Sequence, residues 1–308
     1  MPSRGVDEAL LEAHVALRRA DLRRFPGFRD GDEATESIRR FLRPLHERGD
    51  VWAHEEGGRV TAALAWAHEE DSWVGPPVSR VAMDLEAAPR AFREATLDAA
   101  LPRMEADLEL MLDPSHLETR RALLARGLRV DSIQLLGDPA RARAKLQAPP
   151  LPAEVTLAPL GEEDIEASIA LQRATFTREP EYCWFGADPR WLARCEESLR
   201  ASREGHLAVR RGGAFAGHVS AAIEERPFWG RTAGMFLLLA PSLRGRGLLR
   251  PLYAALLDAM IEAEADLFKG GTSQGPVLRL AREMERPLYA IHLRRGATTP
   301  PERFGGWL

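Results

Sequence analysis

The stretch that decides the fold is FLLLAPSLRGRGLLRPLYAALLDAMIEA, residues 236–263. Its first part, residues 236–240, is a run of apolar residues typical of a buried strand. A loop containing Gly245 and Gly247 follows and leads directly into an amphipathic helix. The apolar residues of this helix recur at the spacing of a core-facing stripe: Leu249, Leu252, Tyr253, Leu256, Leu257, Met260 and Ile261. The stretch therefore predicts a strand, a glycine loop and a helix in direct succession.

This succession predicts an anion site. The first backbone N–H groups of a helix have no partner inside the helix, and the helix dipole adds about half a positive charge there. Glycines let the backbone come close to a phosphate, and Arg244 and Arg246 add permanent charge. The alternative is an ordinary strand-to-helix turn with two solvated arginines. The loop is neither a dinucleotide fingerprint, since no third glycine follows, nor a Walker A loop, since no Lys-Ser/Thr follows.

With these residues in this order, the sequence resembles the GNAT superfamily of N-acetyltransferases. The pyrophosphate loop of that family reads Gln/Arg-x-x-Gly-x-Gly/Ala, and Arg244, Gly247 and Leu249 occupy its three motif positions. The preceding Leu-Ala-Pro at 239–241 matches the end of the family's strand. Leu249 departs from the usual small residue, but that position contributes mainly its backbone. The resemblance covers residues 155–295 and implies an α/β fold.

The resemblance implies acetyl-CoA or another acyl-CoA as co-substrate. The pantetheine arm would pair with the backbone of residues 237–239, and one N–H there would hold the oxyanion. The family's second motif has an asparagine where this chain has Ser273 or Gln274. We expect the arm to lie between strands at 215–224 and 233–240. The expected donor site comprises Leu237, Leu238, Leu239, Arg244, Gly245, Arg246, Gly247, Leu248, Leu249, Ser273 and Gln274.

The general acid departs from the family pattern. A tyrosine of the second motif usually protonates the leaving thiolate, but Leu280 stands at that position here. Tyr253 lies on the core stripe of the long helix, which favours a structural role, and Tyr289 alternates within the last predicted strand. Tyr182 lies in a loop between helices that in this family cover the acceptor. Tyr182 is therefore the tyrosine that we take as a catalytic candidate.

The general base also departs from the family pattern. The family often has a glutamate on the motif strand, but residues 232–234 read Thr-Ala-Gly. Glu224 and Glu225 end the preceding strand, where a carboxylate with a pKa near neutrality could take the proton of the ammonium. The alternative is a pair of solvated carboxylates. His218 is the second candidate, and its alternative is a packing or surface histidine.

Residues 147–154, QAPPLPAE, contain three prolines and predict a linker. We expect a domain at 1–146 and the acyl-CoA domain at 155–308. The two halves have the same predicted order of helices and strands. The fold class is therefore α/β, with a mixed α+β sheet in each of two tandem GNAT-like domains, and the alternative is two unrelated α/β layers. The plan is similar to that of mycothiol synthases, although this chain lacks their usual second-motif residues.

The first half reads as a copy that has lost its cofactor site. Its equivalent strand and loop, VAMDLEAAPRAFREATLDAAL at 81–101, contain no glycine. Pro89 ends the strand, but Glu86 and Glu94 flank the place where phosphates would lie, and their charge would repel a phosphate. We therefore expect one CoA per chain.

Composition bounds the remaining possibilities. The net charge is −4 and neither half has a basic excess, which argues against a nucleic-acid partner. We expect no metal and a cytoplasmic location, because Cys183 and Cys195 are too few for a disulfide scaffold or a zinc site. We expect no membrane span, because the sequence has no run of 18 apolar residues. The expected function is transfer of an acyl group to a primary amine of a small molecule or peptide. The alternatives are a catalytically silent acyl-CoA-binding module and an acyltransferase whose donor is bound to an acyl carrier protein.

Overall fold

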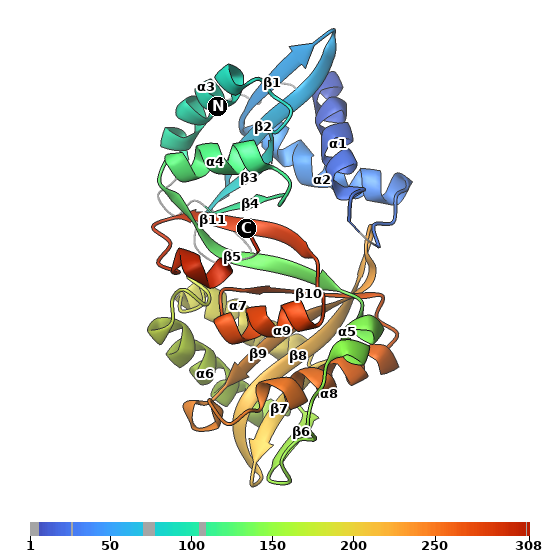
Figure 1. Ribbon diagram of the computed structural model, residues 1–308, viewed down its shortest axis with the longest axis vertical. Helices are drawn as coiled ribbons and strands as arrows, with labels where there is room; N and C mark the ends of the chain where they lie inside the picture. The colour runs from blue at the N-terminus through green and yellow to red at the C-terminus, as the bar shows by residue number, and fades with distance from the viewer. Residues whose placement is uncertain (1–5, 26, 70–77, 105–108, 306) are drawn as a thin grey trace.

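The structure is a computed structural model that describes residues 6–25, 27–69, 78–104, 109–305 and 307–308 (Figure 1). In chain order, the first half contains α1 (Glu8–Leu22), α2 (Asp32–Arg48), β1 (Asp50–Glu56), β2 (Arg59–Glu69), β3 (Val78–Asp84), α3 (Arg90–Ala100), β4 (Glu109–Leu112), α4 (Leu117–Ala125), β5 (Leu128–Gly137) and α5 (Pro139–Lys145). The second half contains β6 (Val155–Pro159), α6 (Ile165–Arg178), α7 (Pro189–Ala201), β7 (His206–Arg211), β8 (Ala214–Arg226), β9 (Gly230–Leu239), α8 (Leu249–Glu262), β10 (Leu267–Thr272), α9 (Gly275–Glu283) and β11 (Leu288–Arg295).

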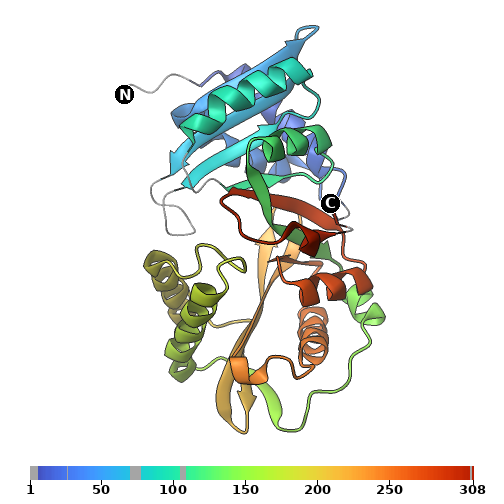
Figure 2. The same cartoon turned by 60° about the vertical axis from the view of Figure 1, so that its left-hand side comes forward.

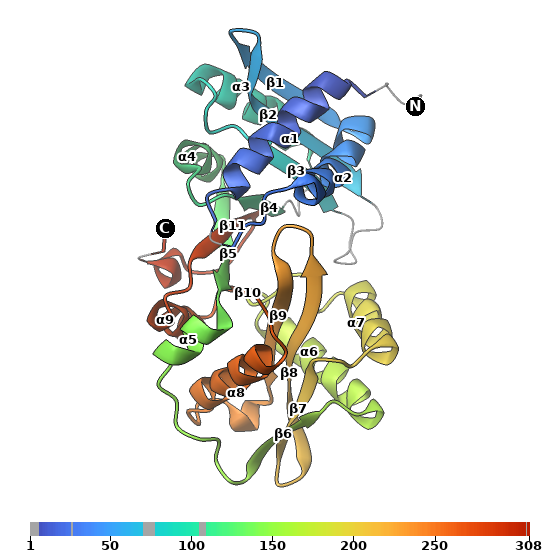
Figure 3. The same cartoon turned by 90° about the vertical axis from the view of Figure 1, so that its right-hand side faces the viewer.

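These strands form two sheets. Strands β1, β2 and β3 form a three-stranded antiparallel sheet, with α1 and α2 on one face and α3 on the other (Figure 3). The other eight form one mixed sheet in the order β4-β11-β5-β10-β9-β8-β7-β6. The mixed α/β class predicted from the sequence is therefore present. Strand β5 of the first half lies between β10 and β11 of the second, so the two halves share one sheet.

The second half of the eight-stranded sheet is covered on both faces. Figure 2 shows α6 and α7 on one side of β8 and β9 and α8 on the other. Helix α8 buries most of the predicted stripe, including the fully enclosed Leu252, Leu256, Leu257 and Met260, but Ile261 is 40% exposed, so its assignment to the stripe is wrong. Residues of β8 and β9 such as Val219 and Ala233 belong to the same core. The apolar spacing seen in the sequence therefore fixes α8 against the sheet.

The feature that positions the site is a gap between two parallel strands. Strands β9 and β10 are paired at only three positions, of which the last joins Gly234 to Lys269. From Met235 onward, β9 has no strand partner on that side among the residues that the structure describes, while β8 pairs with β9 from Gly230 to Leu239. The expectation that the arm lies between strands 215–224 and 233–240 is therefore wrong. Those strands are hydrogen-bonded throughout, and the gap lies on the opposite edge of β9.

Candidate acyl-CoA site

A cavity of about 390 Å³ opens along this gap. Its lining comes from the end of α6 and the following loop, from β9, from the loop before α8, from β10 and from α9. Ten of the sequence-predicted site residues line it together: Tyr182, Leu237, Leu238, Leu239, Arg244, Gly245, Gly247, Leu248, Leu249 and Gln274. Residues far apart in the sequence are thus brought to one place by the parting of β9 and β10.

The outer end of the cavity is the start of α8. Gly245 and Gly247 have φ angles of 71° and 73°, in the region that only glycine adopts without strain. No atom lies within 4 Å of the position that a Cβ would take at either glycine. No side chain caps the first turn of α8, where Leu248 is the N-cap. The local backbone therefore presents helix N–H groups to open space, which is the geometry of an anion site.

The two arginines of the loop have different surroundings. Arg244 donates from Nε to the carbonyl of Leu239 at 3.0 Å, and its guanidinium also contacts Glu179 and Thr175 at the end of α6. Arg246 is exposed, donates to the carbonyl of Ser242 at 2.7 Å and does not line the cavity. Arg244 thus connects the loop to α6, and an incoming phosphate would compete with Glu179 for its charge.

Tyr182 occupies the gap itself. Its side chain is half-buried and stacks on Phe176, with ring centroids 5.5 Å apart, and its hydroxyl donates to the carbonyl of Leu237 at 3.1 Å. Burial raises the pKa of Tyr182, so the phenol is protonated at neutral pH. Leu237 is one of the residues whose backbone we expect to pair with the pantetheine arm. The hydroxyl of Tyr182 therefore occupies the carbonyl of Leu237 with which an amide of the pantetheine arm would pair.

The second-motif residues divide into one that lines the cavity and one that does not. Ser273 is fully buried, and its hydroxyl donates to the carbonyl of Glu181, which connects β10 to the loop carrying Tyr182. Gln274 lines the cavity at the N-cap of α9, and its side-chain Nε2 has no hydrogen-bond partner in the described chain. An unpartnered buried amide donor is costly unless a ligand accepts from it. Gln274 therefore has an unused donor beside the gap.

The three base candidates lie outside the cavity. Glu224 and Glu225 have side chains 61% and 68% exposed and are paired with Arg226 and Arg29. Glu224 is the nearer to the gap, because it pairs with Thr232, two positions before the last β9–β10 pair at Gly234.

His218 is 2% exposed on β8 and is hydrogen-bonded at both ring nitrogens, to Ser168 at 2.7 Å and to His206 at 3.0 Å. Burial, with the neighbouring His206, lowers the pKa of His218 to about 3. The imidazole is therefore neutral near pH 7 and holds a proton only weakly.

Among the cavity residues that the sequence reasoning did not assign to the site are two polar ones deep in the core, Arg286 and Tyr253. Arg286 lines the cavity although it lies between α9 and β11, outside every motif. Tyr253 is 4% exposed in the core of α8, as expected from its spacing, but it also lines the cavity. The helical stripe identifies which residues are buried. It does not distinguish a residue buried against a sheet from one buried against a gap in that sheet.

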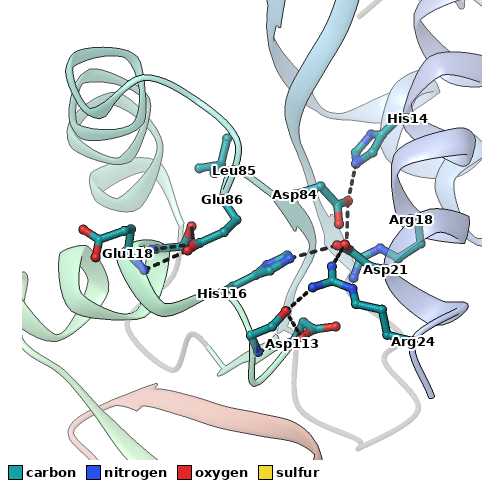
Figure 4. Close-up of polar contacts among 12 residues, drawn as sticks. His14, Arg18, Asp21, Arg24, Asp84, Leu85, Glu86, Asp113, His116 and Glu118 are labelled. Atoms are coloured by element: carbon teal, nitrogen blue, oxygen red, sulfur yellow. Dashed lines mark hydrogen bonds and ion pairs between the residues drawn. The ribbon is translucent and has the colours of Figure 1, made fainter. Parts of the chain in front are cut away.

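The corresponding place in the first half is closed by charged side chains (Figure 4). Asp84, at the end of β3, accepts from His14 at 2.9 Å and from Arg18 at 3.1 Å. The carboxylate of Glu86 accepts from the backbone N–H groups of Glu118 and Thr119, at 3.1 and 3.0 Å, and so caps the start of α4. The carboxylates at this strand end thus already have partners within the chain.

The remainder of this region is filled as well. Arg93 is 5% exposed and donates to the carbonyls of the loop residues Leu85, Glu86 and Ala88. The space between β3 and β4 belongs to an apolar core that contains Met83, Leu85, Leu110 and Leu112. Beside it, Asp21, Asp113 and His116 offer ligand atoms within 4.8 Å of one another, but the carboxylate of Asp21 already binds Arg24 and His116.

The class of protein that this architecture resembles is defined by structural comparison. A GCN5-related N-acetyltransferase from Sphaerobacter thermophilus superposes with a TM-score of 0.56 at 16% identity, covering 93% of this chain and 91% of that one. A GNAT-family acetyltransferase from Colwellia psychrerythraea gives 0.51 at 12% identity, covering 92% and 96%. A tandem GNAT protein from the clavulanic acid biosynthesis pathway gives 0.47 at 17%, covering 96% and 98%.

No protein-family model and no curated protein matches the chain. The superpositions nonetheless give the fold: the chain has the GNAT N-acetyltransferase fold over nearly its whole length, and the sequence resemblance to this superfamily is confirmed at that level. No helix in the part of the chain that the structure describes combines the length and the apolar character needed to cross a bilayer.

Proposed function

We propose that the chain transfers an acyl group from acyl-CoA to a primary amine of a small molecule or peptide. The observation that carries this proposal is the cavity between β9 and β10, which ends at the uncapped start of α8 and its two positive-φ glycines. The pyrophosphate would lie on the N–H groups of residues 245–249, with the pantetheine arm along the free edge of β9.

The proposed reaction depends mainly on holding the amine and the thioester in the right orientation. The amine first loses a proton, and its nitrogen attacks the thioester carbonyl and forms the C–N bond. The C–S bond then breaks, the nitrogen loses a second proton, and the thiolate leaves and takes a proton to become CoA-SH. A backbone N–H on the free edge of β9 would hold the oxyanion during attack. Tyr182 is the proposed proton donor to the thiolate, because its protonated phenol lies in the gap.

For the base we retain the order Glu225 or Glu224 first and His218 after them. Glu224 has the better position, since its charge acts on Lys269 of β10, which pairs with Gly234 at the closed end of the gap. His218 is the weaker candidate because its lowered pKa and two hydrogen bonds leave it little tendency to accept a proton.

One observation favours a second candidate function. None of the base candidates lines the cavity, which is what a catalytically silent acyl-CoA-binding module would show. A donor bound to an acyl carrier protein would use the same cavity through its phosphopantetheine. A reducing, cytoplasmic location fits either function, because Cys183 and Cys195 form no disulfide.

The test is a transfer assay with acetyl-CoA and other acyl-CoAs against a panel of primary amines, followed by isosteric variants. We expect Glu224→Gln or Glu225→Gln to lower turnover about 100-fold with little change in CoA affinity. Glu262→Gln, an exposed change at the end of α8, is the control and should leave turnover unchanged. Tight CoA binding without transfer to any amine would favour the silent module.

A further inference from the structure

Arg286 is a buried cation at the closed end of the cavity. Its side chain is 4% exposed, and its guanidinium lies over the ring of Phe268, 4.3 Å from the centroid. Phe268 belongs to the paired part of β10, one residue before the last β9–β10 pair. The next residue on the same face is Gly270, where a Cβ would lie 3.9 Å from Nη2 of Arg286. The guanidinium is therefore held where the two strands begin to part.

The first half of the chain fixes the orientation of this guanidinium. Nη2 donates to the carbonyl of Leu135 at 2.7 Å and Nε donates to that of Leu136 at 3.4 Å, both on β5. These bonds to neutral carbonyls orient the group without neutralising it. Nη1 makes no hydrogen bond within the described chain, and Arg286 lines the cavity. One arm of the fork is thus available to a ligand.

No carboxylate in the described chain compensates this charge. Among the residues that the structure describes, the group that acts electrostatically on Arg286 is the phenol of Tyr253, which also lines the cavity. Burial lowers the pKa of Arg286 to about 10, so the side chain is still a cation at neutral pH. By contrast, the buried Arg294 is paired with Asp131 at 3.1 Å. Buried charges are usually paired, and an unpaired one beside an open cavity indicates an anionic ligand group.

We propose that Arg286 binds a carboxylate at the far end of the acyl group, and that the donor is the CoA thioester of a short dicarboxylic acid. This inference rests on the proposed function, because it places the acyl group at the closed end of the gap. A carboxylate there would accept from Nη1 of Arg286 in a site shielded from water, where a charge-assisted hydrogen bond is strongest. An acetyl group has no carboxylate with which this guanidinium could form an ion pair.

The experiment is calorimetric titration of the full chain with CoA, acetyl-CoA and succinyl-CoA. We expect succinyl-CoA to bind about 30-fold more tightly than acetyl-CoA, as for other desolvated charge pairs. Arg286→Met keeps the aliphatic packing on Phe268 and should abolish that preference while acetyl-CoA affinity stays within about threefold. Arg286→Lys keeps the charge but not the fork and should retain part of the preference.

A matched control is Arg93→Met in α3, which removes another buried arginine bonded to backbone carbonyls, this one in the first half and away from the cavity. It should leave the preference for succinyl-CoA intact. Equal affinity of the unmodified chain for acetyl-CoA and succinyl-CoA would overturn the inference without any variant, as would a preference that survives in Arg286→Met. Failure of all three ligands to bind would instead contradict the proposed function itself.

Discussion

The two strand-to-helix loops of this chain have the same place in the fold and opposite properties. In the second half, the loop before α8 contains two positive-φ glycines, no cap on the helix and a cavity beside it. In the first half, the start of α3 has no side-chain cap either, but its loop contains no glycine, the strand end carries Asp84 and Glu86, each already bonded to groups of the chain, and the core beside it is apolar. The difference teaches that an uncapped helix start is not sufficient for an anion site, because the loop before it must also leave room for the anion.

The first half is nevertheless part of the candidate site. Strand β5 lies next to β10 in the shared sheet, and its Leu135 and Leu136 carbonyls orient Arg286. The first half has no glycine loop of its own, but its strand β5 thus still orients a side chain of the candidate site. Because these contacts cross between the halves, the comparison has to be tested on the full chain.

The stoichiometry of CoA binding gives the largest expected contrast. Of the two corresponding loops, the one before α8 combines an uncapped helix start with two positive-φ glycines and an adjoining cavity, so we expect one CoA per chain, measured by calorimetry or native mass spectrometry. The start of α3 in the first half is also uncapped, but its loop has no glycine and a phosphate there would meet the carboxylates of Asp84 and Glu86. A value near two, or CoA bound against residues 84–94, would contradict the comparison.

Gly247→Asp should reduce CoA affinity about 100-fold or more, because it places a Cβ and a negative charge where the pyrophosphate is expected. The matched control is Gly58→Asp in the β1–β2 turn, where φ is also 73° and no atom lies within 4 Å of a Cβ. Both changes force the same backbone strain, of about 1 kcal/mol, so both should lower stability alike. An unchanged calorimetric affinity in folded Gly247→Asp would remove the anion site from this loop.

Much of the candidate site could be predicted from the sequence because it depends on local patterns. The apolar run of β9, the glycines at 245 and 247 and the stripe of α8 are adjacent in the chain. Each has a physical requirement that local sequence expresses: burial, a positive φ or a helical period. The positions of these elements could therefore be assigned without knowing which strands pair.

The residues that depend on strand pairing were not predictable in the same way. The gap was expected on the β8 side of β9, but it lies on the β10 side. The prediction failed because the pairing of strands that are distant in the sequence cannot be determined from any single segment. Arg286 enters the cavity only because β5 of the other half lies beside β10. Glu224 and Glu225 were placed at the expected gap and instead end a strand at the solvent.

Glu86→Ala should lower the free energy of unfolding by about 1–2 kcal/mol, the usual cost of losing an N-terminal cap. Burial alone would raise the pKa of Glu86, but the hydrogen bonds from Thr119 and Glu118 outweigh it and lower the pKa below its usual value. Its contribution is therefore present above the unfolded-state pKa and is lost as pH falls. Denaturant unfolding should show the difference from the unmodified chain at pH 7 and a smaller one near pH 3. A constant difference across this range would mean that the cap is not the ionised carboxylate.

The smallest expected effect concerns Tyr182. Its neutral hydrogen bond lies across the gap in the second half. The corresponding region of the first half contains ion pairs and an apolar core instead. Tyr182→Phe keeps the stacking on Phe176 but frees the carbonyl of Leu237 for the pantetheine arm. A neutral hydrogen bond contributes about 0.5–1.5 kcal/mol, so CoA should bind about 2- to 10-fold more tightly to this variant. Turnover should fall at the same time if the phenol protonates the thiolate. Tyr289→Phe, at a half-buried tyrosine that packs on Trp229 away from the cavity, should change neither quantity. Weaker CoA binding by Tyr182→Phe would mean that the phenol contacts the donor rather than occupying its place, and Tyr182 would then not close the gap.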